Sequence, residues 1–316
     1  MEADNLQLTV SSNEVGTRFD RFLAAQLELS RKEVLTLLKS EAVFLNGKTA
    51  NLKSKGLKLE LDDVIDLSLG RLASLSRILP NEQIAVDYLV DEPSFVVANK
   101  PAGMPVMPLV PGETTTVLNA VVARYPQIQG VGEGGLKSGI VHRLDTDTSG
   151  ALVIAKTTEQ WQHLRAAFSQ GEPKKTYLAL VHGHPRKEGA HQMQLVTAQH
   201  RPARVRVVTP EHPLYKKSRT CSLSFKRLET LAKASLIEIE LHTGFLHQIR
   251  VMFAELGHPV LGDKVYGKNL GGLSAPRHML HAHRLKFTDL SRKHFDILCP
   301  LPDDFKVRLN AVRKGG

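Results

Sequence analysis

The sequence has few cysteines and no long apolar run, and both absences restrict the class of protein. Its 316 residues include two cysteines, Cys221 and Cys299, too few for a disulfide framework or a cysteine-rich zinc site. No apolar stretch approaches the roughly 20 residues that a membrane-spanning helix requires. The opening residues, MEADNLQLTV, lack the basic start and apolar core of a secretory signal. We therefore expect a cytoplasmic protein that does not bind a membrane.

Common nucleotide and metal motifs are also missing. The sequence contains neither G-x-x-x-x-G-K-[ST] nor H-E-x-x-H, which argues against a nucleotide hydrolase and a zincin. Residues 130–135, GVGEGG, fit G-x-G-x-x-G, but a dinucleotide site needs a strand before this motif and a helix after it. Pro126 and a loop come before it and Ile140 follows it. We interpret this segment as a glycine loop.

Basic residues are present in excess. Lysine and arginine number 42 against 32 acidic residues, a net charge of +10, and such a balance is typical of proteins that bind nucleic acid. Within residues 182–227, ten basic residues stand against two acidic ones, and residues 31–58 hold seven against two. Both stretches are candidates for a phosphate track, although a solvated basic surface would have the same composition.

Two short helices are predicted near the N-terminus. Residues 18–27 place apolar side chains on one helical face: Phe19, Phe22, Leu23 and Leu27. Ser30 and Glu33 form a capping-box pattern for a second helix that ends near Ser40. Its predicted inward side chains are Val34, Leu35 and Leu38. Strands at 43–45 and 64–69 then complete a small helix–helix–strand module, followed by a linker at 70–82.

The rest of the chain predicts an α+β fold, with strands that alternate irregularly with helices. Thr158 is the predicted cap of a helix that carries Trp161 inward, and residues 247–256 form a second helix closed by Gly257. Residues 284–287 and 295–298 are predicted to pair as a late hairpin. The spacing is too irregular for repeated βαβ units, so we expect a mixed, mainly antiparallel sheet with flanking helices.

Three histidines near the C-terminus require a test for a metal site. His281 and His283 would share one face of a strand, a spacing that some zinc enzymes use, and His278 is close by. No Cys, Asp or Glu lies between Asp263 and Asp289 to complete a ligand set. A structural or RNA-facing role is therefore favoured, and a histidine-based metal hydrolase is kept as an alternative.

Residues 139–150, GIVHRLDTDTSG, hold the strongest candidate for chemistry. Arg143 and Asp145 lie at the end of an apolar stretch. A carboxylate acts as a nucleophile or general base, and a guanidinium beside it favours the ionised form. An ordinary surface pair in a turn would also explain these two residues.

The segment HRLDTDTSG resembles the signature of the RluA-type pseudouridine synthases, enzymes that isomerise uridine in RNA to pseudouridine. Residues 16–69 separately resemble the S-four type RNA-binding module that often precedes this catalytic domain. Other blocks similar to the family's follow in its order and together cover residues 84 to about 300. They are KPAG at 100–103, KTYLALV at 175–181, TGFLHQIR at 243–250, GHPVLGD at 257–263 and LHAHRLKF at 280–287.

The resemblance implies a division into residues 1–79, the RNA-binding module plus linker, and residues 80–316, the catalytic domain. The implied reaction cuts the bond between ribose and base nitrogen, turns the uracil and rejoins it through carbon 5. That isomerisation has no net redox change or hydrolysis and calls for no cofactor or metal. Asp145 matches the family's essential aspartate. The sequence leaves open whether it attacks the sugar carbon, adds to the base or removes the ribose 2′ proton.

The same resemblance implies roles for residues around the flipped uridine. Arg250 matches the basic partner of the aspartate, Tyr177 the aromatic that stacks on the uracil, and Arg143 the residue that fills the vacated space. Lys175 is expected near phosphate. The basic residues of the module that we expect to hold phosphate are Arg31, Lys32, Lys48, Lys53 and Lys55.

The expected partner is RNA, with large-subunit ribosomal RNA favoured and transfer RNA as the alternative, and a monomer is expected because no long apolar seam is evident. A catalytically idle RNA-binding protein is a second alternative, disfavoured because Asp145, Tyr177 and Arg250 are all present. Two departures from the family pattern affect substrate fit. The family commonly has arginine in place of Phe245 and histidine in place of Met107.

Overall fold

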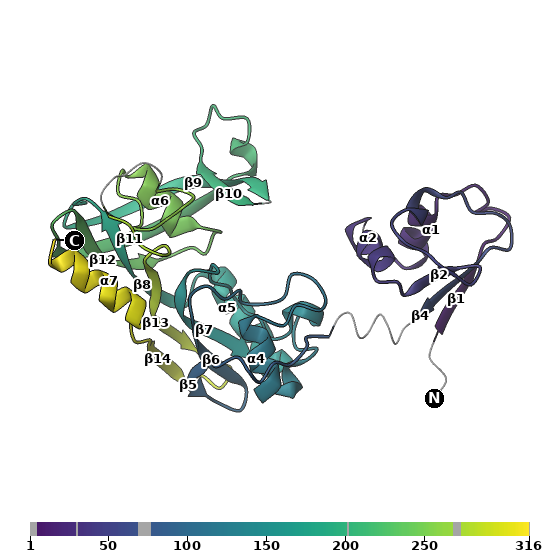
Figure 1. Ribbon diagram of the computed structural model, residues 1–316, viewed down its shortest axis with the longest axis horizontal. Coiled ribbons are helices and arrows are strands. Elements are labelled where there is room, and N and C mark those ends of the chain that lie inside the picture. Colours follow the sequence, from purple (N-terminus) through teal and green to yellow (C-terminus); the bar gives the residue numbers. More distant parts are fainter. Residues whose placement is uncertain (1–4, 30, 69–76, 201, 268–272, 316) are drawn as a thin grey trace. The chain divides into compact units, whose positions relative to one another are not determined.

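The computed structural model describes residues 5–29, 31–68, 77–200, 202–267 and 273–315. The chain divides into two compact units, residues 1–77 and 78–316 (Figure 1). The linker predicted at 70–82 lies partly outside the described residues. Its later part belongs to the second unit, because Ile78 is fully buried in that unit's core.

The first unit is a small antiparallel sheet with two helices. The sheet order is β1-β4-β2-β3, so the second and third strands form a hairpin beside the last strand. The elements are β1 (Asn5–Thr9), α1 (Phe19–Gln26), α2 (Arg31–Lys39), β2 (Val43–Leu45), β3 (Lys48–Thr49), the 3₁₀ turn η1 (Ser54–Gly56) and β4 (Val64–Ser68).

The predicted helix faces are confirmed for α1 and partly wrong for α2. Phe19, Phe22 and Leu23 are buried as expected. In α2, the inward face is formed by Val34, Leu37 and Leu38, whereas Leu35 is only half-buried. The observed set has i, i+3, i+4 spacing, which defines one face of a helix, and Leu35 lies one residue off that face. The cap predicted at Ser30 lies outside the described residues.

The second unit is built on a ten-stranded sheet, mixed and mainly antiparallel. The strand order is β10-β9-β11-β12-β8-β13-β7-β6-β5, with β14 paired to β13. The strands are β5 (Asp87–Asp91), β6 (Phe95–Lys100), β7 (Ser149–Ala155), β8 (Lys174–His182), β9 (Glu188–His200), β10 (Ala203–Val207), β11 (Arg219–Thr230), β12 (Ala234–Leu241), β13 (Leu280–Thr288) and β14 (His294–Leu298). The helices are α4 (Val117–Arg124), α5 (Thr158–Gln170), α6 (Gln248–Glu255) and α7 (Asp303–Arg313), with 3₁₀ turns η2 (Pro126–Ile128), η3 (Gly135–Lys137) and η4 (Tyr215–Lys217). The predicted late hairpin is confirmed as β13 and β14.

Helices cover both faces of this sheet because alternate residues of each strand are apolar. On β8, Tyr177 and Ala179 join the cluster that includes α4 and α6, whereas Leu178 and Leu180 join the cluster of α7. The opposite face near β6 and β7 packs against Leu164 of α5. Within the described part of the chain, no helix is both long and apolar enough to cross a bilayer.

The cap of α5 is one residue earlier than predicted. Thr157, in extended conformation, accepts a hydrogen bond from the Gln160 N–H through its hydroxyl, and Thr158 is the first helical residue. An N-cap is the last residue with non-helical backbone, so the pattern alone could not decide between adjacent threonines. The shift leaves Trp161 on the inner side, where its indole N–H donates to the Ile140 carbonyl.

Strands β7 and β13 run parallel to each other within the sheet and are the only parallel pair among the described residues. Their close approach requires a glycine at the point where they pair. Gly150 pairs with Ala282 and has φ of +123°. A Cβ at this position would lie 2.3 Å from the Ala282 carbonyl oxygen. Glycine therefore allows the close approach of β7 to β13, the strand that lies between β7 and β8 in the sheet.

Residues 188–200 and 202–218, which we call the hairpin arm, form the outer edge of the sheet. They comprise β9, β10 and the segment through η4, and Figure 1 shows this hairpin projecting from the body of the second unit. Along β10, Arg204 and Arg206 are exposed and Val205 between them is buried. Lys216 and Lys217 add exposed positive charge near the end of the arm.

Candidate active site

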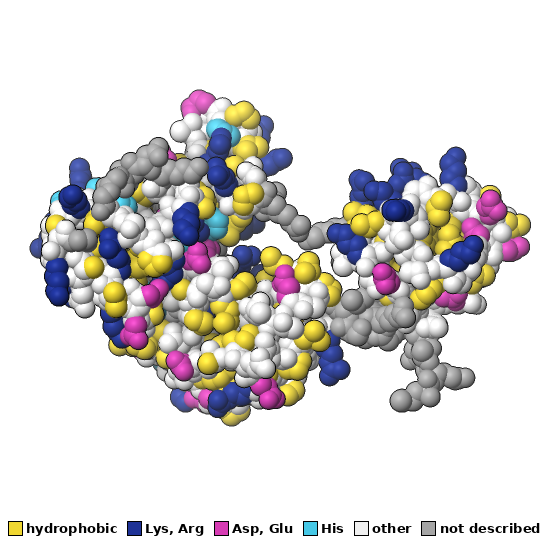
Figure 2. Space-filling model, in the orientation of Figure 1, with side chains coloured by type: hydrophobic (Ala, Val, Ile, Leu, Met, Phe, Trp, Pro, Cys, Tyr) yellow, Lys and Arg dark blue, Asp and Glu magenta, His cyan; other side chains and the backbone are white. Residues whose placement is uncertain are grey.

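A cavity of about 970 Å³ opens on the second unit. It is bordered by β8, α5, the start of α6 and the segment before β7, and Figure 2 shows a hollow between the elements that Figure 1 labels α5 and α6. The five site residues predicted in this unit all line it, although they come from three separate segments. They are Arg143, Asp145, Lys175, Tyr177 and Arg250.

An ion-pair network of Asp145, Arg250 and Asp263 holds the candidate catalytic carboxylate. Arg250 Nη1 donates to Asp145 Oδ2 at 2.8 Å. The other edge of the guanidinium makes two bonds to Asp263, from Nε at 2.7 Å and from Nη2 at 3.1 Å. The side chain of Asp263 is fully buried, whereas that of Asp145 is 16% exposed. One carboxylate thus anchors the arginine, and the other stays open to the cavity.

The network keeps Arg250 and Asp263 charged in spite of their burial. Burial by itself would lower the pKa of Arg250, but the bonds and charge of Asp263, followed by those of Asp145, raise this pKa above its ordinary value. Burial also acts to raise the pKa of Asp263, yet the bonds and charge of Arg250 outweigh it and lower this pKa. The backbone N–H groups of Val265 and Tyr266 donate to the same carboxylate at 2.8 and 3.0 Å.

Lys100 braces the segment that carries Asp145. Its fully buried ammonium donates to the carbonyls of Pro101 and Thr146, both at 2.7 Å. Burial lowers the pKa of Lys100 to about 7, an effect partly offset by the charge of Asp147. These bonds restrict the backbone immediately after the candidate catalytic residue.

The next two residues of this segment are also held, by two residues that lie just before β13. Arg277 Nη1 donates to the Asp147 carbonyl at 3.0 Å. The Thr148 hydroxyl pairs with His278 Nε2 at 2.8 Å. Burial lowers the pKa of His278 to about 4, so the ring is neutral at pH 7. The position of Asp145 is therefore supported by contacts at each of the three residues that follow it.

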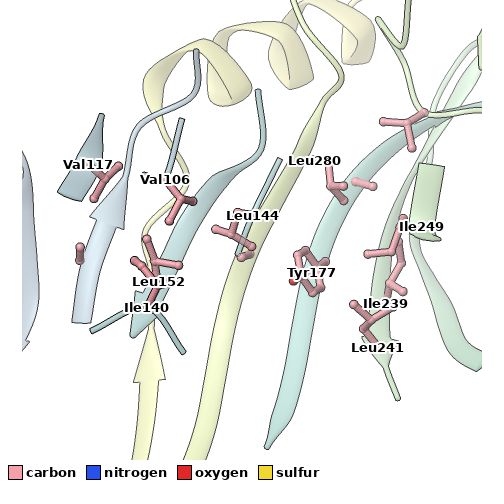
Figure 3. Close-up of a cluster of buried hydrophobic side chains, with 14 of the residues drawn as sticks. Val106, Val117, Ile140, Leu144, Leu152, Tyr177, Ile239, Leu241, Ile249 and Leu280 are labelled. Atoms are coloured by element: carbon pink, nitrogen blue, oxygen red, sulfur yellow. The ribbon is translucent and has the colours of Figure 1, made fainter. Parts of the chain in front are cut away.

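Lys175 and Tyr177 point to the same side of β8 because they are two residues apart. Tyr177 lies in the layer of hydrophobic side chains that also contains Ile239 and Leu280 (Figure 3). Burial, followed by the charge of Asp145, raises the pKa of its phenol, so the ring stays uncharged. Lys175 is 8% exposed, and burial lowers the pKa of its ammonium. It can therefore reach a group inside the cavity but not one on the outer surface.

The cavity lining includes Arg143 and one of the two departures from the family pattern, Phe245. The Arg143 side chain is exposed at the cavity rim. Phe245 also borders the cavity, and both Phe245 and Met107 pack against the main hydrophobic cluster. Both departures thus have apolar neighbours, which suits the residues present.

The phosphate-binding residues predicted in the first unit are exposed where they are described. Arg31, Lys48, Lys53 and Lys55 all face solvent, and the side chain of Lys32 lies outside the described residues. Figure 2 shows Lys and Arg side chains gathered along one edge of this unit.

The histidine cluster serves as internal support. His281 is fully buried, with one ring nitrogen paired to the Ser149 hydroxyl and the other to the Cys299 carbonyl. His283 also pairs with that carbonyl, at 2.8 Å. In the described part of the chain, no group of three or more His, Cys, Asp or Glu is placed to hold a metal ion. These contacts assign the histidines to structure, which disfavours the metal-hydrolase alternative.

Several supporting residues were not predicted from the sequence. Asp263 and Lys100 lie in segments that resemble the family's blocks, which was the available signal, but no local pattern indicates that they contact Arg250 and Thr146. Arg277 had no signal beyond being a charged residue in a loop. His247, within the block at 243–250, approaches Asp145 Oδ2 with its Nε2 at 3.9 Å.

Comparisons with known proteins show which family the chain is similar to. Residues 94–255 match the family described as RNA pseudouridylate synthase. An uncharacterized RNA pseudouridine synthase of Synechocystis sp. is 33% identical, over 96% of this chain and 92% of that protein. The ribosomal large subunit pseudouridine synthase D of Zymomonas mobilis is 32% identical, over 95% of each chain. The solved structure of human RNA Pseudouridylate Synthase Domain Containing 4 is similar in fold, with TM-score 0.58 and 20% identity, covering 72% of this chain and 92% of that one.

Proposed function

The chain belongs to the RNA pseudouridylate synthase family, and on that premise we propose that it isomerises uridines of large-subunit ribosomal RNA with Asp145 as the catalytic residue. As an RNA pseudouridine synthase it is an isomerase. The observation that carries the proposed site is the bond between Arg250 and the cavity-facing carboxylate of Asp145. The ribosomal substrate is supported by the name of the Zymomonas relative and of a second relative, from Nitrosomonas europaea, that is 33% identical over 98% of this chain.

The reaction exchanges one bond to the ribose for another. The bond from ribose carbon 1′ to uracil nitrogen 1 breaks, and a bond from carbon 1′ to uracil carbon 5 forms. Carbon 5 loses its proton and nitrogen 1 gains one. Asp145 meets the uridine as an ionised carboxylate, and Arg250 orients that carboxylate and compensates its charge. Because Arg250 is itself held by Asp263, the carboxylate is positioned before the RNA arrives.

The cavity is suited to a nucleotide that has left its helix. In this proposal, the uracil stacks on Tyr177, and Arg143 at the rim occupies the space that the uridine leaves. The buried ammonium of Lys175 contacts the phosphate or a carbonyl oxygen of the flipped nucleotide. Flipping costs a few kcal/mol, which phosphate contacts elsewhere on the protein offset.

The first unit is the proposed source of many of those contacts. We assign residues 1–79 as an S-four type RNA-binding module plus linker, supported by its compact helix–strand core and its exposed basic side chains. The catalytic domain is correspondingly residues 80–316. The protein is proposed to act as a monomer in the cytoplasm.

The proposed substrate is tested by tritium release from RNA labelled at uracil carbon 5. Unmodified large-subunit ribosomal RNA and a mixture of unmodified transfer RNAs are each incubated with the full chain. We expect release from the ribosomal RNA only, because each pseudouridine formed frees one carbon-5 hydrogen. Release only from transfer RNA would move the substrate to that class, and release from neither would contradict both.

Removing positive charge from the first unit is expected to reduce the salt dependence of RNA binding. For the variant Lys48→Gln, Lys53→Gln, Lys55→Gln, the slope of log affinity against log salt should become shallower by about 2, since each lost phosphate contact contributes about 0.7. Binding is measured by filter retention between low and moderate salt.

The matched control removes three lysines that pair with carboxylates on the second unit, Lys137, Lys293 and Lys306. It has the same net charge as the test variant and should keep the wild-type slope. Equal slopes for the two variants would show that the first unit does not hold phosphate.

A further inference from the structure

A second side chain approaches Asp145 from the start of α6, and it has a support of its own. His247 Nε2 lies 3.9 Å from Asp145 Oδ2, the oxygen that also accepts from Arg250. On its other edge, His247 Nδ1 lies 2.9 Å from the hydroxyl of Tyr266. Both rings are partly buried and neither has a role in the function proposed above.

The Tyr266 hydroxyl has two neighbours, and together they specify where its proton goes. The backbone N–H of Val205 donates to this oxygen at 2.9 Å. The hydroxyl has one proton to give, and His247 Nδ1 is its only other hydrogen-bond partner among the described residues. When the hydroxyl donates to Nδ1, both groups are satisfied and the imidazole proton is on Nε2, facing Asp145. In the opposite tautomer, the hydroxyl proton would have no acceptor within the described part of the chain.

The environment of His247 favours this neutral form. Burial lowers the pKa of the ring, although Asp145 acts in the opposite direction. The other charged groups that face it are Arg250 on its own helix, Asp263 on the following turn and Arg143 at the cavity rim. The two arginines lower this pKa and the two aspartates raise it.

The backbone of His247 is strained, and the surrounding residues hold it in this conformation. It has φ of 53°, in the left-handed region that residues other than glycine rarely adopt. Strain of this kind persists where the surroundings hold the residue, and it gathers at functional sites. The hydrogen bond to Tyr266 holds the His247 ring. The Arg250 guanidinium lies over the Tyr266 ring, 5.3 Å from the centre of that ring.

The support continues to the hairpin arm. Val205, whose N–H donates to Tyr266, lies in β10 between the exposed Arg204 and Arg206. A phosphate bound by either arginine would therefore be held one residue away from the start of this chain of contacts.

We propose that Tyr266 and His247 are positioning residues that connect β10 of the hairpin arm to Asp145, with the Nε2–H of His247 directed at the catalytic carboxylate. The proposal rests on the pseudouridine synthase function proposed above. The distance of 3.9 Å is longer than a hydrogen bond, and we expect it to shorten when RNA is bound, as contacts at catalytic groups often do. RNA seated on Arg204 and Arg206 would then help to orient the carboxylate.

Two substitutions separate the parts of this connection. Tyr266→Phe removes the hydroxyl and keeps the ring beside Arg250. His247→Asn removes the edge that faces Asp145 and keeps an oxygen near Tyr266, and asparagine tolerates the left-handed backbone. Each should lower the single-turnover rate of tritium release about tenfold at saturating RNA, because one lost hydrogen bond of about 1.4 kcal/mol corresponds to that factor. The RNA dissociation constant should stay within twofold of the wild-type value.

The double variant distinguishes a connected pair from two separate residues. If the two act as a unit, the double variant should be no slower than the slower single variant. The control Tyr88→Phe, on the distant strand β5, should keep the wild-type rate. Multiplied losses in the double variant, or unchanged rates in both single variants, would overturn the proposal.

A spectroscopic measurement on the full chain tests the same proposal without activity. The ¹⁵N shifts of the His247 ring should show a neutral imidazole protonated at Nε2. In Tyr266→Phe, Nδ1 is free to take a proton, so the ring should become charged at a higher pH than in the wild type. The acid limb of the pH–rate profile should then shift to higher pH. A ring protonated at Nδ1 in the wild type would refute the proposal, whether or not the enzyme is active on the RNAs tested. Inactivity on those RNAs would by itself refute only the proposed substrate.

Discussion

Asp145→Asn is expected to reduce tritium release by about 10⁴-fold or more, the largest effect of any substitution considered. The change removes the negative charge that the reaction requires and keeps the size of the side chain. Arg250 keeps both of its bonds to Asp263, and the Asn oxygen can still accept from Nη1. The free energy of unfolding should therefore stay within about 1 kcal/mol of the wild type.

RNA affinity separates a catalytic role from a structural one. The dissociation constant of Asp145→Asn should be within twofold of the wild type, measured by filter binding alongside single-turnover release. Asp87→Asn, which removes one charge from an exposed position of β5, is the matched control and should keep full activity. A loss of binding or stability as large as the loss of rate would show that Asp145 supports the fold instead of the reaction.

Arg250→Met is expected to lose both stability and activity. The substitution leaves Asp263, whose side chain is fully buried, as an uncompensated charge, which costs about 3–5 kcal/mol of unfolding free energy. It also removes the group that orients Asp145, and we expect the rate at saturating RNA to fall about 10²-fold or more. Urea unfolding and tritium release measure the two effects.

The loss of stability in Arg250→Met should depend on pH. In the wild type, the pKa of Asp263 is lowered, so its stabilising contribution is present above the unfolded pKa and is lost as pH falls. Without Arg250, burial raises that pKa, and the buried charge is relieved by protonation as pH falls. The stability gap between variant and wild type should therefore be larger at pH 7.5 than at pH 5.

A second substitution tests the cause. Arg250→Met with Asp263→Asn removes both charges and keeps an acceptor for the N–H groups of Val265 and Tyr266. Most of the stability should return and activity should not. If stability stayed as low as in Arg250→Met alone, the buried charge would not be the cause of the loss.

The local sequence pattern predicted secondary structure correctly where the deciding residues lie within one short segment. The face of α1 and the hairpin of β13 and β14 follow from spacing and residue type within a few positions. Errors occurred where the pattern permits neighbouring solutions, as with Leu35 and Leu37 in α2 or Thr157 and Thr158 at the start of α5. A shift of one residue leaves the composition of such a segment unchanged, and only packing against the rest of the protein decides between the two.

The sequence by itself determined the family of the protein and the positions that we propose for its chemistry: Asp145, Tyr177 and Arg250 each lie in a short block whose residue order is informative. Only the tertiary structure decided how these positions are supported. Arg250 and Asp145 are 105 residues apart, and Thr148 and His278 are 130 apart. Val205 reaches Tyr266 across 61 residues. A hydrogen bond depends on distance and direction in space, and these are set by strand order and helix placement, which no local pattern encodes.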